Sequence, residues 1–165
     1  MEWIVCEAKP RWAPALRVAC IQNSDSTRRL REVRGLAEIE QQLLLRPAAL
    51  LAIEVGHTNF TEVLNWLPGI RERLPNVPTA ALLDFSWVHS ESPGEMTSTR
   101  LWLVEMALHE AGFDHVSTSP RRLREVVELG SRWTAVVAKQ QASEKATESS
   151  LADLWASLPW QPTGH

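Results

Sequence analysis

Short apolar segments alternate along this chain with longer segments in which apolar residues recur every three to four positions. This alternation is typical of parallel strands joined by crossover helices. The apolar segments predict five strands, at residues 3–8, 28–33, 48–55, 77–85 and 114–119. The periodic segments predict five helices, at residues 11–22, 36–45, 59–74, 100–112 and 120–141. We therefore expect an α/β fold, with a five-stranded parallel sheet between two layers of helices.

Several segments carry more specific expectations. Residues 48–55 are almost wholly apolar, as a central strand buried on both faces should be, whereas the polar residues 28–33 suit an edge strand. Pro68-Gly69 should kink or interrupt the helix at residues 59–74. The mostly polar segment at residues 86–99 is fourteen residues long, which is long for a strand-to-helix connection, so a lid, a docking loop or an extra turn has to be considered.

Apolar content falls at residues 140–150 and recovers afterwards, which predicts three parts of the chain. These are an α/β domain at residues 1–139, a polar linker or helix extension at 140–150, and a C-terminal docking peptide at 151–165. The peptide carries a short amphipathic helix and a trailing tryptophan, with its apolar side chains at Leu151, Leu154, Trp155, Leu158 and Trp160. The free energy gained by burying these side chains is about equal to the entropy cost of ordering the peptide. We therefore expect the peptide to be disordered alone and to become ordered in a preformed groove, on its own domain, on a second copy or on another protein.

Composition and charge narrow the class of protein. The hydrophobic share of 44% and the net charge of −3 fit an ordinary globular protein and argue against a nucleic-acid binder driven by bulk charge. A cluster of four arginines on and beside the predicted edge strand could still contact phosphates: Arg28, Arg29, Arg31 and Arg34. No signal peptide and no 18-residue apolar run occur, so we expect a cytoplasmic protein without a membrane partner. Cys6 and Cys20 lack metal or disulfide spacing and are expected to be buried.

Three segments resemble the receiver domains of bacterial response regulators. RPAALLAIEV (46–55) resembles a receiver's third strand, LPNVPTAALLD (74–84) resembles its fourth, and AGFDHVSTSPRRLREVVEL (111–129) resembles its last strand and helix. The three matches lie in receiver order and at receiver-like separations, within residues 3 to about 139. The resemblance implies a CheY-like, flavodoxin-like fold with a C-terminal extension, and a place in signal transduction.

The resemblance also implies a phosphorylation site, and this sequence departs from it at every position. Receivers carry an acidic pair that holds Mg²⁺, an aspartate nucleophile, a serine or threonine, and a lysine. The corresponding positions here are Glu7 for the acidic pair, Ile53 or Glu54 for the nucleophile, Leu83 followed by Asp84 for the hydroxyl, and Ser119 for the lysine. A phosphoryl group needs neutralising positive charge, which a serine cannot supply. We therefore expect a degenerate pseudo-receiver without catalytic residues or cofactors, in which Glu54 could stand as a fixed negative charge.

A receiver fold without phosphorylation keeps its contact surfaces. Trp102, Met106 and His109 fall outside the buried stripe of the helix at residues 100–112, and together with the C-terminal peptide they form the predicted partner-binding set. The hypothesis is thus a phosphorylation-independent interaction or regulatory module with an unknown protein partner. One form of this hypothesis is homodimerisation, either through the predicted helix at residues 100–112, strand at 114–119 and helix at 120–141, or through exchange of the C-terminal peptide.

A second hypothesis is that the chain is a small α/β protein that binds a ligand or a metal ion. In one version of this hypothesis the protein is a hydrolase. Glu7, Glu54 and Asp84 follow the carboxyl ends of central strands, where open α/β sheets bind ligands. His57 and His89 lie on adjacent loops and would complete a metal site. No tight ligand spacing such as H-x-x-x-H supports this hypothesis.

Overall fold

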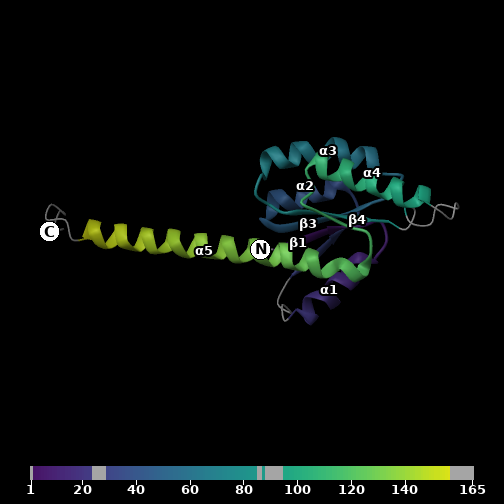
Figure 1. Ribbon diagram of the computed structural model, residues 1–165. Helices are drawn as coiled ribbons and strands as arrows, with labels where there is room; N and C mark the ends of the chain where they lie inside the picture. The colour runs from purple at the N-terminus through teal and green to yellow at the C-terminus, as the bar shows by residue number, and fades with distance from the viewer. Residues whose placement is uncertain (1, 24–28, 85–86, 88–94, 157–165) are drawn as a thin grey trace. The chain divides into compact units, whose positions relative to one another are not determined.

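The structure, a computed structural model, describes residues 2–23, 29–84, 87 and 95–156 (Figure 1). It divides into two compact units, Met1–Trp133 and Thr134–His165. The strands are β1 (Glu2–Cys6), β2 (Leu30–Val33), β3 (Ala48–Val55), β4 (Thr79–Leu83) and β5 (His115–Ser117). The helices are α1 (Trp12–Gln22), α2 (Leu36–Leu45), α3 (Phe60–Arg73), α4 (Glu95–Ala111), a short 3₁₀ helix (Pro120–Arg122) and α5 (Leu123–Ala156).

The five strands form one parallel sheet in the order β2-β1-β3-β4-β5. This is the flavodoxin-like, doubly wound order, which confirms the predicted fold class. β3 lies at the centre and is buried along its length except at Glu54, and β2 lies at an edge, as their compositions predict.

Helices cover both faces of the sheet. Figure 1 shows α2, α3 and α4 on one side and α1 on the other. Side chains that alternate along each strand fill two core clusters: Ile53 and Leu83 pack toward α2, α3 and α4, whereas Leu50 and Leu82 pack toward α1 and the first turns of α5. The two clusters give the first unit a hydrophobic core on each side of its sheet.

Most predicted elements are found with nearly the predicted bounds, and α2 and β3 match at both ends. Two expectations were wrong in detail. α4 begins at Glu95 instead of residue 100, so part of the predicted loop is helical. α3 is one helix through Pro68, so the predicted interruption was wrong, whereas the predicted kink stays a prediction; Pro68 and Gly69 both lie on its exposed face.

α5 continues as one helix from Leu123 to Ala156, through residues 140–150 and into the predicted docking peptide. Leu151, Leu154 and Trp155 lie within this helical segment, whereas Leu158 and Trp160 lie outside the described residues. Within the described part of the chain, no helix combines the length and the apolar character that a membrane crossing requires.

Candidate functional site

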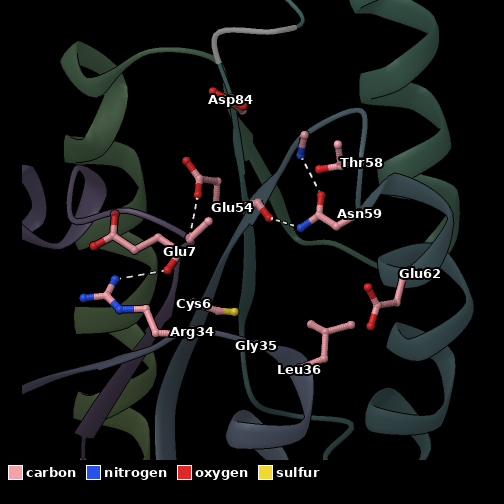
Figure 2. A pocket seen from close by; sticks show the side chains of 12 residues that line it. Cys6, Glu7, Arg34, Gly35, Leu36, Glu54, Thr58, Asn59, Glu62 and Asp84 are labelled. Atoms are coloured by element: carbon pink, nitrogen blue, oxygen red, sulfur yellow. Dashed lines mark hydrogen bonds between the residues drawn. The ribbon is translucent and has the colours of Figure 1, made fainter.

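A hollow of about 240 Å³ lies at the carboxyl ends of the central strands, the edge where open α/β sheets bind ligands. Its lining includes Glu7 after β1, Glu54 on β3 and Asp84 after β4, so the structure brings the three predicted carboxylates to one place. In Figure 2, Asp84 lies at the top of the view, with Glu54 and Glu7 below it. We call this site the acidic hollow.

Glu7 is almost completely buried, with 1% of its surface exposed, and its carboxylate caps helix α1. Oε2 accepts hydrogen bonds from the backbone N–H groups of Arg11 at 2.8 Å and Trp12 at 2.5 Å, and Oε1 accepts one from Ala13 at 3.3 Å. The first N–H groups of a helix have no hydrogen-bond partner within the helix. A negative charge at this end also interacts favourably with the positive end of the helix dipole. The carboxylate at the receiver's acidic-pair position therefore starts a helix.

Glu54 and Ile53 point to different sides of the sheet because side chains alternate along a strand. Ile53 is fully buried in the cluster beneath α2, α3 and α4. Glu54 reaches the acidic hollow, where its Oε2 accepts a hydrogen bond of 2.9 Å from the backbone N–H of Ala8 (Figure 2). Of the two candidate nucleophile positions, only Glu54 lies in the hollow, and it ties the end of β3 to the end of β1.

The loop after β3 is fixed by Asn59. Its Oδ1 accepts a hydrogen bond of 2.8 Å from the backbone N–H of Gly56, and its Nδ2 donates one of 2.9 Å to the backbone oxygen of Glu54. The side chain thereby closes the turn between β3 and α3. Figure 2 shows both hydrogen bonds, which run from the Asn59 side chain to backbone atoms at the rim of the hollow.

Two arginines that the sequence analysis did not assign to the site lie at its border. Arg11 Nη1 donates to Asp84 Oδ1 at 3.1 Å, and the Arg11 guanidinium lies 4.8 Å from the centre of the Trp12 ring. Arg34 Nη1 donates to the backbone oxygen of Glu7 at 3.1 Å, and its Nη2 pairs with Glu32 at 3.3 Å. An arginine just before a helix and one just after an edge strand are ordinary surface positions, so no sequence signal pointed to these contacts.

The remaining receiver positions have structural roles. Leu83 is fully buried in the same cluster as Ile53. Ser119 does not line the acidic hollow; its Oγ accepts a hydrogen bond of 3.2 Å from the backbone N–H of Arg121 and caps the 3₁₀ helix at Pro120–Arg122. The serine at the lysine position therefore starts the last helical segment.

The predicted metal ligands do not form a cluster in the part of the chain that the structure describes. Among the described residues, no group of three or more His, Cys, Asp and Glu side chains is placed to hold a metal ion. The His57 ring instead packs on the Trp87 ring, with 3.7 Å between their centres, and Trp87 Nε1 donates to the backbone oxygen of Val55 at 3.0 Å. His89, the other predicted ligand, lies outside the described residues.

The cysteines contribute no chemistry to this site. Cys6 and Cys20 are both buried, as expected, and burial raises the pKa of the Cys6 thiol to about 11. A thiol with such a pKa is a weak nucleophile near neutral pH, because the thiolate is the reactive form. Cys6 lines the hollow as a small apolar side chain.

The predicted partner surface on α4 is exposed. Trp102 is 56% exposed and Met106 39%, and Leu103, which the sequence analysis did not single out, is 55% exposed. His109 is also exposed, but its Nδ1 lies 2.9 Å from the backbone oxygen of Phe113 and so joins the end of α4 to the following turn. We define Trp102, Leu103 and Met106 as the α4 patch.

No protein-family model and no curated protein sequence matches this chain. Solved structures do match its fold. A CheY-like protein (tadZ) from Pseudomonas aeruginosa PAO1 is 18% identical with a TM-score of 0.56, and the match covers 81% of this chain and 99% of that one. HP1043, an orphan response regulator of H. pylori, is 14% identical with a TM-score of 0.51, and the match covers 80% of this chain and 95% of that one.

A third similar structure is an atypical orphan response regulator, for which a new phosphorylation-independent regulatory mechanism is described. It is 15% identical with a TM-score of 0.54, and the match covers 80% of this chain and 96% of that one. Together these similarities show that the chain has a CheY-like fold. At such low identity they carry the fold alone, so function has to be argued from the residues of the site.

Proposed function

We propose that this chain is a receiver-fold regulatory module, not an enzyme, that acts through protein contacts and without phosphorylation. The observation that carries the proposal is the use of Glu7, since the carboxylate at the Mg²⁺-binding position is buried as the N-terminal cap of α1. The similar orphan regulator with a phosphorylation-independent mechanism offers a precedent in the same fold.

The charge of the acidic hollow supports the same proposal. Four carboxylates line it, those of Glu7, Glu54, Glu62 and Asp84. Two guanidinium groups lie beside them, that of Arg34 in the lining and that of Arg11 paired with Asp84, so the carboxylates remain in excess. Two like unit charges about 5 Å apart repel by about 3 kcal/mol at an effective dielectric constant of about 20. A phosphoryl group with two or more negative charges would therefore be destabilised here.

The proposal is tested by incubating the protein with Mg²⁺ and acetyl phosphate and measuring its intact mass, with a phosphorylatable receiver domain treated in parallel. We expect the receiver domain to gain the mass of one phosphoryl group and this chain to remain unmodified. A stable adduct that is lost in Glu54→Gln would contradict the proposal, because it would identify Glu54 as an acceptor.

The α4 patch and the C-terminal segment, residues 151–165, are the proposed partner-binding elements. The patch places three large apolar side chains in solvent on adjacent turns of one helix. Exposed apolar clusters with an aromatic member are typical of protein interfaces. The partner is proposed to be a protein, either a second copy or a different chain.

This part of the proposal is tested with matched variants. Trp102→Ala combined with Met106→Ala should abolish capture of the partner and leave the melting temperature unchanged. Val18→Ala combined with Ile21→Ala is the control, since these side chains are 54% and 64% exposed on α1. Deleting residues 150–165 should also abolish capture from a folded protein. Capture that is equal in the α4 variant, the deletion and the control would refute both proposed elements.

A further inference from the structure

A second hollow, of about 510 Å³, lies at the amino ends of the strands, whereas the acidic hollow lies at their carboxyl ends. It is lined by Glu2 at the start of β1, by Arg29, Leu30 and Arg31 at the start of β2, and by Arg46 just before β3. The proposed function does not use this edge. Open α/β sheets usually bind ligands at the carboxyl ends of their strands, so the fold alone gives no reason to expect a site here.

A buried carboxylate organises two of the three arginines. Glu2 Oε2 accepts a hydrogen bond of 2.9 Å from Arg31 Nε, and Glu2 Oε1 accepts one of 2.9 Å from Arg46 Nη1. The Glu2 side chain is only 10% exposed, whereas those of Arg31 and Arg46 are 40% and 57% exposed. Glu2 therefore holds two guanidinium groups in place while leaving much of each in solvent.

The arginines retain hydrogen-bonding capacity after binding Glu2. A guanidinium has five N–H donors in a rigid fork, and the two bonds to Glu2 engage one nitrogen of each arginine. Arg29 is exposed and forms no ion pair within the described ranges. The hydrogen bond from Arg31, more than any other contact, holds the pKa of Glu2 below its ordinary value of 4.5, so the ion pairs persist to a pH below that value.

The charge balance of the hollow identifies the ligand class. Among the described residues that line it, three arginines and one glutamate give a net charge of +2. A phosphomonoester dianion has the opposite charge, and its oxygens match the bidentate geometry of arginine forks. The volume also falls within the roughly 300–1,000 Å³ of small-molecule sites.

We infer that this arginine hollow binds the terminal phosphate of a small phosphomonoester, such as a nucleotide. A nucleic-acid backbone is disfavoured because each phosphodiester carries only one charge and the whole chain has a net charge of −3. The inference does not depend on the proposed function.

Titration calorimetry with adenosine diphosphate, inorganic phosphate and adenosine tests the inference. We expect the two phosphate ligands to bind and adenosine not to bind. Arg29→Ala should weaken binding of adenosine diphosphate roughly 10- to 100-fold, the usual loss for one charge-assisted hydrogen-bond partner. Arg46→Lys should also weaken it, because a lysine keeps the charge but loses the fork.

Arg124→Ala is the matched control, since Arg124 is an exposed arginine on α5 that pairs with Glu128 on the same helix. It should bind like the unaltered protein. The inference is overturned if the unaltered protein binds neither phosphate ligand, if adenosine binds equally well, or if Arg29→Ala binds as tightly as Arg124→Ala. Tighter binding of a single-stranded oligonucleotide than of adenosine diphosphate would also overturn it. Melting temperatures are compared first, and Arg29→Ala decides the question if Arg46→Lys fails to fold.

Discussion

Single residues decide what this fold can do, and Glu7 is the clearest case. A glutamate after the first strand predicts a remnant of a metal site, yet three backbone N–H groups of the next helix bind its carboxylate. The same residue type at the same place in the fold thus has a structural role. The difference lies in the geometry of the β1–α1 connection, which a linear sequence pattern does not specify.

Glu7→Ala should destabilise the protein by about 2–4 kcal/mol. Loss of a helix cap costs about 1 kcal/mol, and each buried donor left unpaired adds about 1 kcal/mol or more. Glu62→Ala, at an exposed carboxylate of the same hollow, should change the free energy of unfolding by no more than about 0.5 kcal/mol. Urea denaturation measures both values. Equal, small effects would show that the cap does not stabilise α1.

Glu2→Gln should lower stability in a pH-dependent way. The pKa of Glu2 is lowered in the folded state, chiefly because Arg31 donates a hydrogen bond to its carboxylate. The carboxylate therefore stabilises the fold above the ordinary pKa of 4.5, and this stabilisation is lost as the pH falls through the lower folded-state value. The difference in melting temperature between the unaltered protein and Glu2→Gln should be largest near neutral pH. It should disappear well below pH 4.5. A difference that is constant with pH would mean that the ion pairs contribute nothing.

At the scale of elements, the sequence predicts best where periodicity and chain-breaking residues agree. Gly35 precedes α2 and Pro47 follows it, and both ends of α2 and of β3 were predicted correctly. The start of α4 was missed because its first turn, EMTST, is polar and rich in poor helix formers. The sequence did not decide whether residues 140–150 form a linker or extend α5. They lack an apolar stripe, which favours a linker, but their Gln, Ala, Glu and Lys residues favour helix.

Gly130→Ala should destabilise the contact between α5 and the sheet. A Cβ at Gly130 would lie 2.6 Å from the ring of Trp3, a large side chain that is only 1% exposed. Overpacking of this kind costs about 1–3 kcal/mol. Gly69→Ala is the matched control in α3: apart from its chain neighbours and the nearby backbone of its own helix, no atom lies within 4 Å of the added Cβ, so it should stabilise the protein by about 0.5–1 kcal/mol. The melting temperature should fall in Gly130→Ala and rise in Gly69→Ala. A rise in Gly130→Ala would contradict the packing of this glycine against Trp3.

For the molecule as a whole, topology was more predictable than side-chain contacts. Parallel strands end at a common edge, so the convergence of Glu7, Glu54 and Asp84 followed from the predicted order. Arg29 and Arg31 of the arginine hollow belong to the cluster that, from the sequence, could contact phosphates, but the hollow itself did not follow from the sequence. It requires Arg46 and Arg31 to meet Glu2 across three neighbouring parts of the chain. The two edges of the sheet consequently differ in charge, with carboxylates at one and arginines at the other.

Truncation after Lys139 should leave the first unit folded. Both core clusters consist of residues between Trp3 and Trp133, so the truncated chain retains every described core side chain. The described side chains from Ala138 to Ser149 are exposed, and an isolated helix of about this length is marginal in water. Hydrogen exchange of the full chain should therefore be fast for amides after residue 139 and slow in β3, and the truncated protein should melt within about 5 °C of the full chain. A larger fall, or protection of the C-terminal amides comparable to that of β3, would mean that this segment stabilises the folded protein.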